Sequence, residues 1–269
     1  MSRRSDRGKN RPVLRKIREA PCTVRVYESR RVKNMKTREQ NELFYEATST
    51  ARPDSFHLRL PVDRVTLSGD LEIPEDAIGL VLFAHGSGSS RLSIRNQAVA
   101  EVLRGSGIAT LLFDLLTPDE EVEDAYTGHL RFDIGLLSRR LAIVTKEIAD
   151  DPRCRSFGIG YFGASTGGAA ALIAAAALSS NIDAVVSRGG RPDLAGDALK
   201  HVKASTLLIV GERDEEVLRL NERAYKQLTC EKSLAVVPHA THLFAEPGAL
   251  EEVARLAASW FEKHLKERK

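Results

Sequence analysis

The chain has 269 residues, of which 42% are hydrophobic and 29% are charged, as is usual for a globular protein that buries a full core. Its three cysteines are too few and too scattered for a disulfide framework or a zinc site, so we expect free thiols in the cytoplasm. No apolar run reaches the roughly 18 residues that cross a bilayer, and we expect no membrane span and no secretory signal.

The net charge of +3 is distributed unevenly along the chain. Residues 1–50 contain 14 lysines and arginines against 6 acidic residues, and the rest of the chain carries a net charge of −5. We predict that residues 1–54 form a basic, poorly ordered extension and that residues 55–269 form one folded domain. The alternative is that this basic segment contacts nucleic acid, anionic lipid or an acidic partner. It lacks the interleaved aromatic residues and the motifs of nucleic-acid binders, so we favour a solvated extension over a nucleic-acid partner.

From about Ser55 onward, short apolar runs alternate with segments of helical pattern. Two runs with alternating polarity predict half-buried antiparallel strands at 56–60 and 65–73. The later runs are continuously apolar and predict strands that are covered on both faces. These strands are expected at 78–84, 108–113, 156–162, 182–187, 206–210 and 234–237, and helices at 95–104, 134–150, 168–178, 215–228 and 248–265. Strands alternating with helices predict an α/β fold, a parallel sheet with helices on both faces.

A serine lies between a predicted strand and a predicted helix, in the sequence Gly163-Ala164-Ser165-Thr166-Gly167. This spacing is typical of a nucleophile elbow, in which a tight turn lifts the serine hydroxyl above the sheet. The following helix N-terminus offers free N–H groups to a developing oxyanion. The alternative is a glycine-rich turn whose serine only caps the helix.

A serine hydroxyl needs a base, and the base needs an orienting carboxylate, which follow later in the chain in a sheet of this kind. Asp214 comes just after the strand predicted at 206–210 and is our candidate acid. Glu212 and Glu215 are weaker candidates, and a helix N-cap is the alternative role of Asp214.

Two histidines follow the last predicted strand and compete for the role of base. We favour His242, because it lies on a loop with room to reach Ser165, whereas His239 lies at the strand edge. Both candidate partners thus follow strand ends in the order serine, acid, histidine.

The glycine- and serine-rich residues 85–90 follow the strand predicted at 78–84 and are expected to form an oxyanion loop. The expected oxyanion donors are the backbone N–H groups of Ser87 and Thr166. A phosphate-cradling loop is the alternative, although the nucleotide-binding motifs are missing. His85 is interpreted as a structural residue that binds the loop.

Two further features are expected at the same edge of the sheet. Arg91, Arg188 and Arg191 follow strand ends or loops and suggest an anionic substrate, with solvated surface arginines as the alternative. Residues 115–131 form an acidic insertion that either covers a pocket or simply connects two elements.

Residues of about 55–265 resemble an α/β-hydrolase of the dienelactone hydrolase-like family. The matching segments are LVLFAHGSGSSR, ATLLFDLLTPDEE, GYFGASTGGAAAL, VVSRGGRPDL, TLLIVGERDEEV and HATHLFAEPGAL. The resemblance implies a mostly parallel twisted sheet of about eight strands with the catalytic triad at its carboxyl end. Dienelactone hydrolases use a cysteine where this chain has Ser165, which favours a general serine hydrolase. Similar hydrolase domains also occur joined to phosphoribosyltransferase domains, but this sequence contains no phosphoribosyl-binding motif.

These observations predict a carboxylic ester or thioester hydrolase that acts on a small acyl substrate. Ser165, Asp214 and His242 would form the triad, and no metal or organic cofactor is implied. Two alternatives remain open, an acyltransferase that uses the same triad and a non-catalytic binding protein with this fold. The sequence does not indicate an oligomeric state.

Overall fold

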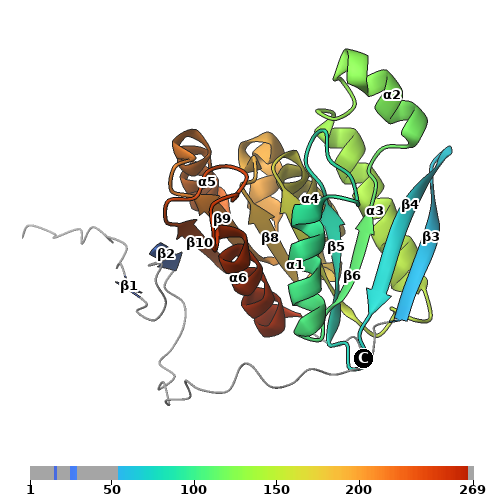
Figure 1. Ribbon diagram of the computed structural model, residues 1–269, viewed down its shortest axis with the longest axis horizontal. Helices are drawn as coiled ribbons and strands as arrows, with labels where there is room; N and C mark the ends of the chain where they lie inside the picture. The colour runs from blue at the N-terminus through green and yellow to red at the C-terminus, as the bar shows by residue number, and fades with distance from the viewer. Residues whose placement is uncertain (1–14, 17–24, 29–53, 266–269) are drawn as a thin grey trace, which may run out of the picture.

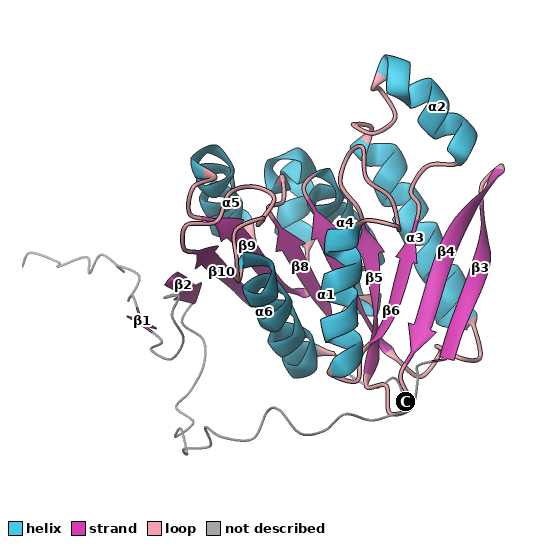
Figure 2. Ribbon diagram, in the orientation of Figure 1, coloured by secondary structure: helices cyan, strands magenta, loops and turns pink. Residues whose placement is uncertain are grey.

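The computed structural model describes residues 15–16, 25–28 and 54–265 of the chain. From Asp54 onward it forms one α/β domain in which helices cover both faces of a central sheet (Figures 1 and 2). The eight strands of this domain are β3 (Asp54–Val62), β4 (Val65–Ile73), β5 (Gly79–Ala84), β6 (Ala109–Phe113), β7 (Gly158–Ala164), β8 (Ala184–Arg188), β9 (Ser205–Gly211) and β10 (Lys232–Val237). The predicted fold class is therefore confirmed.

The sheet has a parallel centre and antiparallel edges. Its order is β1-β2-β10-β9-β8-β7-β5-β6-β4-β3, and the strands from β10 to β6 run parallel to one another. At one edge β4 pairs antiparallel with β6 and with β3. At the other edge β2 (Arg25–Glu28) pairs antiparallel with β10, and β1 (Arg15–Lys16) pairs with β2. The extension predicted for residues 1–54 otherwise lies outside the described residues.

Two separate apolar cores cover the two faces of the sheet. Helices α1 (Ile94–Gly105) and α6 (Ala249–His264) pack together on one face, and α3 (Ile134–Asp150), α4 (Thr166–Leu178) and α5 (Glu215–Gln227) cover the other (Figure 1). The strand β5 is buried along its whole length, as expected from its continuously apolar sequence. None of the helices in the described ranges is both long and apolar enough to cross a membrane.

The structure contains three helical segments that the sequence pattern does not predict, the shortest being the 3-10 turn η1 (Ser179–Asn181) that follows α4. Helix α2 (Pro118–Thr127) lies within the acidic insertion and protrudes from the body of the domain (Figure 1). It begins with a capping box between Thr117 and Glu120, a signal that was present in the sequence but lacked an apolar stripe beside it. The 3-10 segment η2 (Pro192–His201) is interrupted at Gly196, where φ is 51°. The kink divides the segment into two short 3-10 turns.

Candidate active site

Ser165 occupies a strained turn between β7 and α4. Its backbone angles are φ 51° and ψ −120°, a conformation that residues with a side chain rarely adopt. The turn is possible because its glycines allow close packing. A Cβ atom on Gly163 would lie 2.5 Å from the carbonyl oxygen of Gly167, and one on Gly167 would lie 2.0 Å from that of Ala84. The close packing at these glycines maintains the strained turn and places Ser165 at the carboxyl end of β7.

Asp214 and His242 form a close pair on the loops that follow β9 and β10. Nδ1 of His242 lies 2.6 Å from Oδ2 of Asp214. Asp214 stands at the N-cap position of α5, yet its side chain makes no capping hydrogen bond to the helix. Its carboxylate is therefore free to bind the histidine. The His242 side chain is 38% exposed, whereas the Asp214 side chain is only 15% exposed.

The imidazole of His242 lies against the backbone beside Ser165. The Ser165 N–H donates to the carbonyl oxygen of Arg188 at 3.2 Å. The next residue, Gly189, has φ 52°, and a Cβ atom there would lie 3.5 Å from two ring atoms of His242. The imidazole thus lies within van der Waals range of the backbone next to the residue that bonds Ser165, and the positive φ favours glycine at position 189.

The weaker candidates for acid and base pair with each other outside this site. Nδ1 of His239 lies 3.6 Å from Oε2 of Glu212, and the His239 N–H donates to the same oxygen at 3.0 Å. The side chain of His239 is largely exposed. Of the two acid–histidine pairs, the one formed by Asp214 and His242 is the one that lies against the backbone at Gly189, beside the residue that bonds Ser165.

The loop of residues 85–90 follows β5 and contacts the residue next to Ser165. The Ser87 N–H donates to the hydroxyl oxygen of Thr166 at 2.9 Å. Thr166 is buried at the first position of α4, and the loop therefore lies at the helix N-terminus as expected. One of the two predicted oxyanion donors is already engaged, so an oxyanion would have to displace or share the threonine hydroxyl.

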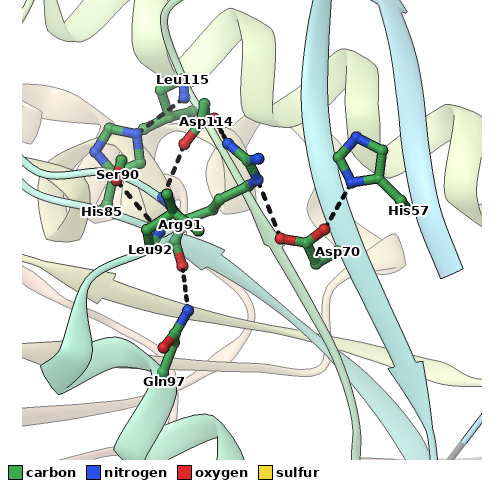
Figure 3. A network of polar contacts seen from close by, with 9 residues as sticks. All are labelled: His57, Asp70, His85, Ser90, Arg91, Leu92, Gln97, Asp114 and Leu115. Atoms are coloured by element: carbon green, nitrogen blue, oxygen red, sulfur yellow. Dashed lines mark hydrogen bonds and ion pairs between the residues drawn. The ribbon is translucent and has the colours of Figure 1, made fainter. Parts of the chain in front are cut away.

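His85 anchors the start of this loop. Its Nδ1 lies 3.0 Å from the carbonyl oxygen of Gly86, and its Nε2 accepts a hydrogen bond from the Leu115 N–H at 2.9 Å (Figure 3). These contacts are those of a neutral imidazole with its proton on Nδ1. Burial lowers the pKa of His85 and opposes its charging. The histidine therefore tethers the loop to the end of β6.

Arg91 anchors the other end of the loop. Its guanidinium contacts both Asp70 on β4 and Asp114 just after β6, and its backbone N–H donates to Asp114 at 2.8 Å (Figure 3). Asp70 also contacts His57, on the neighbouring edge strand, at 2.8 Å. The charge of Arg91 is thus balanced by two carboxylates.

The two other arginines singled out in the sequence differ sharply in their surroundings. Arg191 is partly exposed and forms a two-bond ion pair with Asp193 at 2.9 and 2.8 Å. Arg188 is buried, and its hydrogen bond goes to the amide oxygen of Asn96 at 3.4 Å. Within the described residues, Arg188 has no carboxylate partner.

A cavity of about 280 Å³ opens between the loop of residues 85–90 and the insertion of residues 115–131. The insertion contributes Leu116, Glu121, Asp124 and Arg131 to its wall. The Asp124 carboxylate accepts the backbone N–H of Leu130 at 2.6 Å and pairs with the Arg131 guanidinium, which ties residues 130–131 back to α2. Burial raises the pKa of Glu121. The insertion thus lines a pocket beside the predicted oxyanion loop.

In the part of the chain that the structure describes, no group of three or more His, Cys, Asp or Glu side chains is placed to hold a metal ion. The loops at the carboxyl ends of β5, β9 and β10 supply backbone N–H groups, the Asp214 carboxylate and the His242 imidazole. This set is suited to acyl transfer by a nucleophilic hydroxyl.

Comparison with solved structures identifies the family. The chain is 56% identical to a dienelactone hydrolase from Anabaena variabilis, with a TM-score of 0.79 over 80% of this chain and 100% of that one. At 18% identity, Est1E from Butyrivibrio proteoclasticus shares the fold, with a TM-score of 0.64 over 77% of this chain and 98% of that chain. The protein belongs to the dienelactone hydrolase-like family of α/β-hydrolases.

Among curated sequences, the chain is 60% identical over 201 residues to a putative phosphoribosyl transferase from Mycobacterium tuberculosis. The match covers 75% of this chain but only 44% of that relative, so the chain spans less than half the length of the curated relatives it matches. No family model matches the chain.

Proposed function

We propose that the protein is a serine hydrolase that cleaves a carboxylic ester or thioester through an acyl-enzyme. Its relationship to a dienelactone hydrolase supports an ester hydrolase in general. The observation that carries the finer proposal is the 2.6 Å contact between His242 and Asp214 beside a serine in a strained elbow.

In this mechanism the Ser165 hydroxyl oxygen attacks the substrate carbonyl while Nε2 of His242 takes its proton. Asp214 holds the imidazole by its Nδ1–H and stabilises the imidazolium that forms. The oxyanion receives hydrogen bonds from the N–H groups of Thr166 and Ser87, and the Ser87 N–H leaves the Thr166 hydroxyl to do so. His242 then protonates the leaving alcohol or thiol. Water deacylates the serine through the same histidine.

The cavity between residues 85–90 and the insertion is proposed to hold the part of the substrate next to the carbonyl. Its wall includes the predicted oxyanion loop, and its volume of about 280 Å³ suits a small acyl or alcohol group. The phosphoribosyl transfer in the name of the curated relatives is proposed to belong to the part of those proteins that this chain does not match.

A fluorophosphonate probe tests the proposal directly, because it labels an activated serine. We expect labelling of the wild-type protein, none of Ser165→Ala, and strongly reduced labelling of His242→Asn. His239→Asn is the matched control, because this neighbouring histidine is exposed and pairs with Glu212, and it should label normally. Failure of the wild type to react, or equal reaction of Ser165→Ala, would overturn the hydrolase proposal and leave a binding protein.

A panel of 4-nitrophenyl esters and acyl thioesters of different chain length then identifies the acyl group. Product analysis with and without added alcohol or amine acceptors separates hydrolysis from acyl transfer. Free acid as the main product in both conditions supports the hydrolase, whereas acceptor-dependent product formation supports the acyltransferase.

A further inference from the structure

The turn of residues 188–191, between β8 and η2, binds both backbone groups of Ser165. The Ser165 N–H donates to the Arg188 carbonyl oxygen at 3.2 Å, and the Arg191 N–H donates to the Ser165 carbonyl oxygen at 3.1 Å. A strained backbone such as that of Ser165, with φ 51°, persists only where surrounding contacts fix it. This turn supplies two of those contacts, so its position sets the position of the serine.

The same turn contacts the candidate base. A Cβ atom on Gly189 would lie 3.2 Å from the carbonyl oxygen of His242 and 3.5 Å from two atoms of its ring. The Gly189 N–H donates at 2.7 Å to the carbonyl oxygen of Ile209 on β9, the strand that leads to Asp214. The turn therefore touches the serine and the histidine at once, and a shift of the turn changes their relative position.

One buried side chain fastens this turn to α5. Nδ2 of Asn221 donates to the carbonyl oxygen of Gly190 at 3.0 Å and to that of Val217, one helical turn earlier, at 2.8 Å. Asn221 is completely buried and comes two helical turns after Asp214, the N-cap residue of α5, on the same side of the helix. The asparagine thus joins the turn that binds Ser165 to the helix that begins at the candidate acid.

The stability of α5 alone does not explain an asparagine at this position. The other buried residues of the helix are Val217 and Ala224, so Asn221 is the polar member of an apolar stripe. Asparagine is a weaker helix former than leucine or alanine, and Oδ1 of Asn221 is buried without a hydrogen-bond partner among the described residues. The contact with Gly190, outside the helix, accounts for a residue that the helix itself disfavours.

We propose that Asn221 is a positioning residue that holds the turn of residues 188–191, and through it Ser165, in register with His242. This inference rests on the proposed function and adds a residue to its machinery. The residues that line the cavity of about 280 Å³ do not include Asn221, so it acts on the nucleophile and not on the substrate. Loss of its bond to Gly190 should slow the attack of the serine and leave substrate binding unchanged.

Three variants separate the contact with the turn from the contact within α5. Asn221→Leu removes both hydrogen bonds. Asn221→Thr keeps a donor for the carbonyl oxygen one helical turn earlier, as Thr145 of α3 donates to Leu141 at 2.7 Å, but the shorter side chain does not reach Gly190. Thr145→Val is the matched control, because Thr145 is also buried and makes one hydrogen bond within its helix and one to Tyr161 on β7.

Pre-steady-state release of 4-nitrophenol from a 4-nitrophenyl ester measures acylation and ester binding separately. We expect both Asn221 variants to lower the rate constant of acylation by about ten- to a hundredfold, with the Kd of the ester within about twofold of the wild type. The rate constant of fluorophosphonate labelling should fall by the same factor. Thr145→Val should lower the midpoint of thermal unfolding, because it also removes buried hydrogen bonds, yet leave acylation and labelling unchanged.

Amide hydrogen exchange, measured by NMR, follows the turn without any substrate. The N–H groups of Ser165 and Arg191 donate in the two contacts between the turn and the serine. Their exchange should accelerate by about tenfold or more in Asn221→Thr and stay at the wild-type rate in Thr145→Val.

Failure of this inference and failure of the proposed function give different results. Wild-type acylation and labelling in Asn221→Thr, or an equal loss in Thr145→Val, overturns the positioning role and leaves the hydrolase. A higher Kd with an unchanged acylation rate also overturns it, because Asn221 would then shape the binding site. Unchanged exchange of Ser165 and Arg191 overturns the contact through the turn. If the wild type neither cleaves an ester nor reacts with the probe, the hydrolase proposal fails and the positioning role fails with it.

Discussion

The carboxyl ends of β6 and β9 carry the same kind of residue in two different settings. Asp114 follows β6, Asp214 follows the end of β9, and each of these strands lies two positions from β7 in the sheet. Both side chains are mostly buried, 13% and 15% exposed. Asp114 is bound to Arg91, whereas Asp214 is bound to His242.

The partner therefore separates the roles of these two carboxylates. A guanidinium does not release its proton in a protein, so the Asp114 pair can only hold structure. An imidazole gains and loses a proton near neutral pH, so the Asp214 pair can support proton transfer. The β6 end of the sheet is a clamp for the loop of residues 85–90, and the β9 end is proposed to serve the reaction.

The sharpest way to break this comparison is to neutralise the carboxylate on the β9 side. Asp214→Asn should lower kcat/KM for a 4-nitrophenyl ester by roughly a thousand- to ten-thousandfold, because the imidazole loses its orienting charge. Steady-state kinetics measure the loss. Glu212→Gln, the matched control two residues away, should change kcat/KM less than threefold. Equal losses in the two variants would show that Asp214 is not the acid.

Removing the arginine on the β6 side tests the clamp. Arg91→Met leaves the mostly buried Asp114 without its charged partner and should lower the free energy of unfolding by about 2 kcal/mol. It should also lower kcat by about tenfold with a smaller change in KM, because the oxyanion loop loses one anchor. Urea unfolding and steady-state kinetics measure the two effects.

Arg139→Met is the control for this experiment, since its ion pair with Asp63 lies on the surface and both side chains are about half-exposed. We expect Arg139→Met to lower the free energy of unfolding by less than about 1 kcal/mol and to leave kcat unchanged. An unchanged kcat in Arg91→Met, despite lower stability, would mean that the loop keeps its position without the clamp.

The contact between Ser87 and Thr166 offers a third test, at the loop of residues 85–90 that the Asp114 clamp holds. Thr166→Val removes the hydroxyl that occupies the Ser87 N–H, so the free enzyme loses about 1 kcal/mol of stability. The freed donor should bind the oxyanion without a competing partner, and kcat/KM should rise by about fivefold. Thr166→Ser keeps the hydroxyl and should behave like the wild type. A fall in kcat/KM of the valine variant would instead assign the hydroxyl a supporting role in the oxyanion hole.

The smallest expected effect concerns the tether at His85. Burial holds its pKa below the ordinary value of 6.5, so the folded protein keeps it neutral while the unfolded chain takes up a proton. The free energy of unfolding should therefore fall as the pH drops below about 6.5, by at most about 1.4 kcal/mol per pH unit from this group. Urea unfolding at pH 7.5 and 5.5 measures the fall.

His85→Gln removes this titrating group. The free energy of unfolding of this variant should therefore fall less between pH 7.5 and 5.5 than that of the wild type. The exposed His239, replaced by Gln in the same way, serves as the control and should leave the wild-type pH dependence intact. An identical pH dependence in His85→Gln would show that other groups account for the acid sensitivity.

The sequence by itself determined the fold class and the order of the candidate residues. Continuously apolar runs predicted the parallel strands, because strands covered on both faces cannot carry polar side chains at alternate positions. The glycines around Ser165 predicted a strained elbow, because only glycine permits such close approach of strand and helix. The position of Asp214 and His242 after successive strand ends followed from the same pattern.

Only the tertiary structure decided which charged groups meet. In the sequence Asp114 and Asp214 are both acids after a strand, and Arg91, Arg188 and Arg191 are all arginines after a strand or in a loop. Arg91 and Arg188 have partners far away in the chain, 23 residues for Arg91 with Asp114 and 92 for Arg188 with Asn96, whereas Arg191 pairs with Asp193 only two residues further on. Local sequence patterns do not encode such distant pairings, because these depend on how helices and loops pack across the sheet. The same limit explains why the occupied Ser87 N–H and the unbalanced charge of Arg188 became visible only in the folded chain.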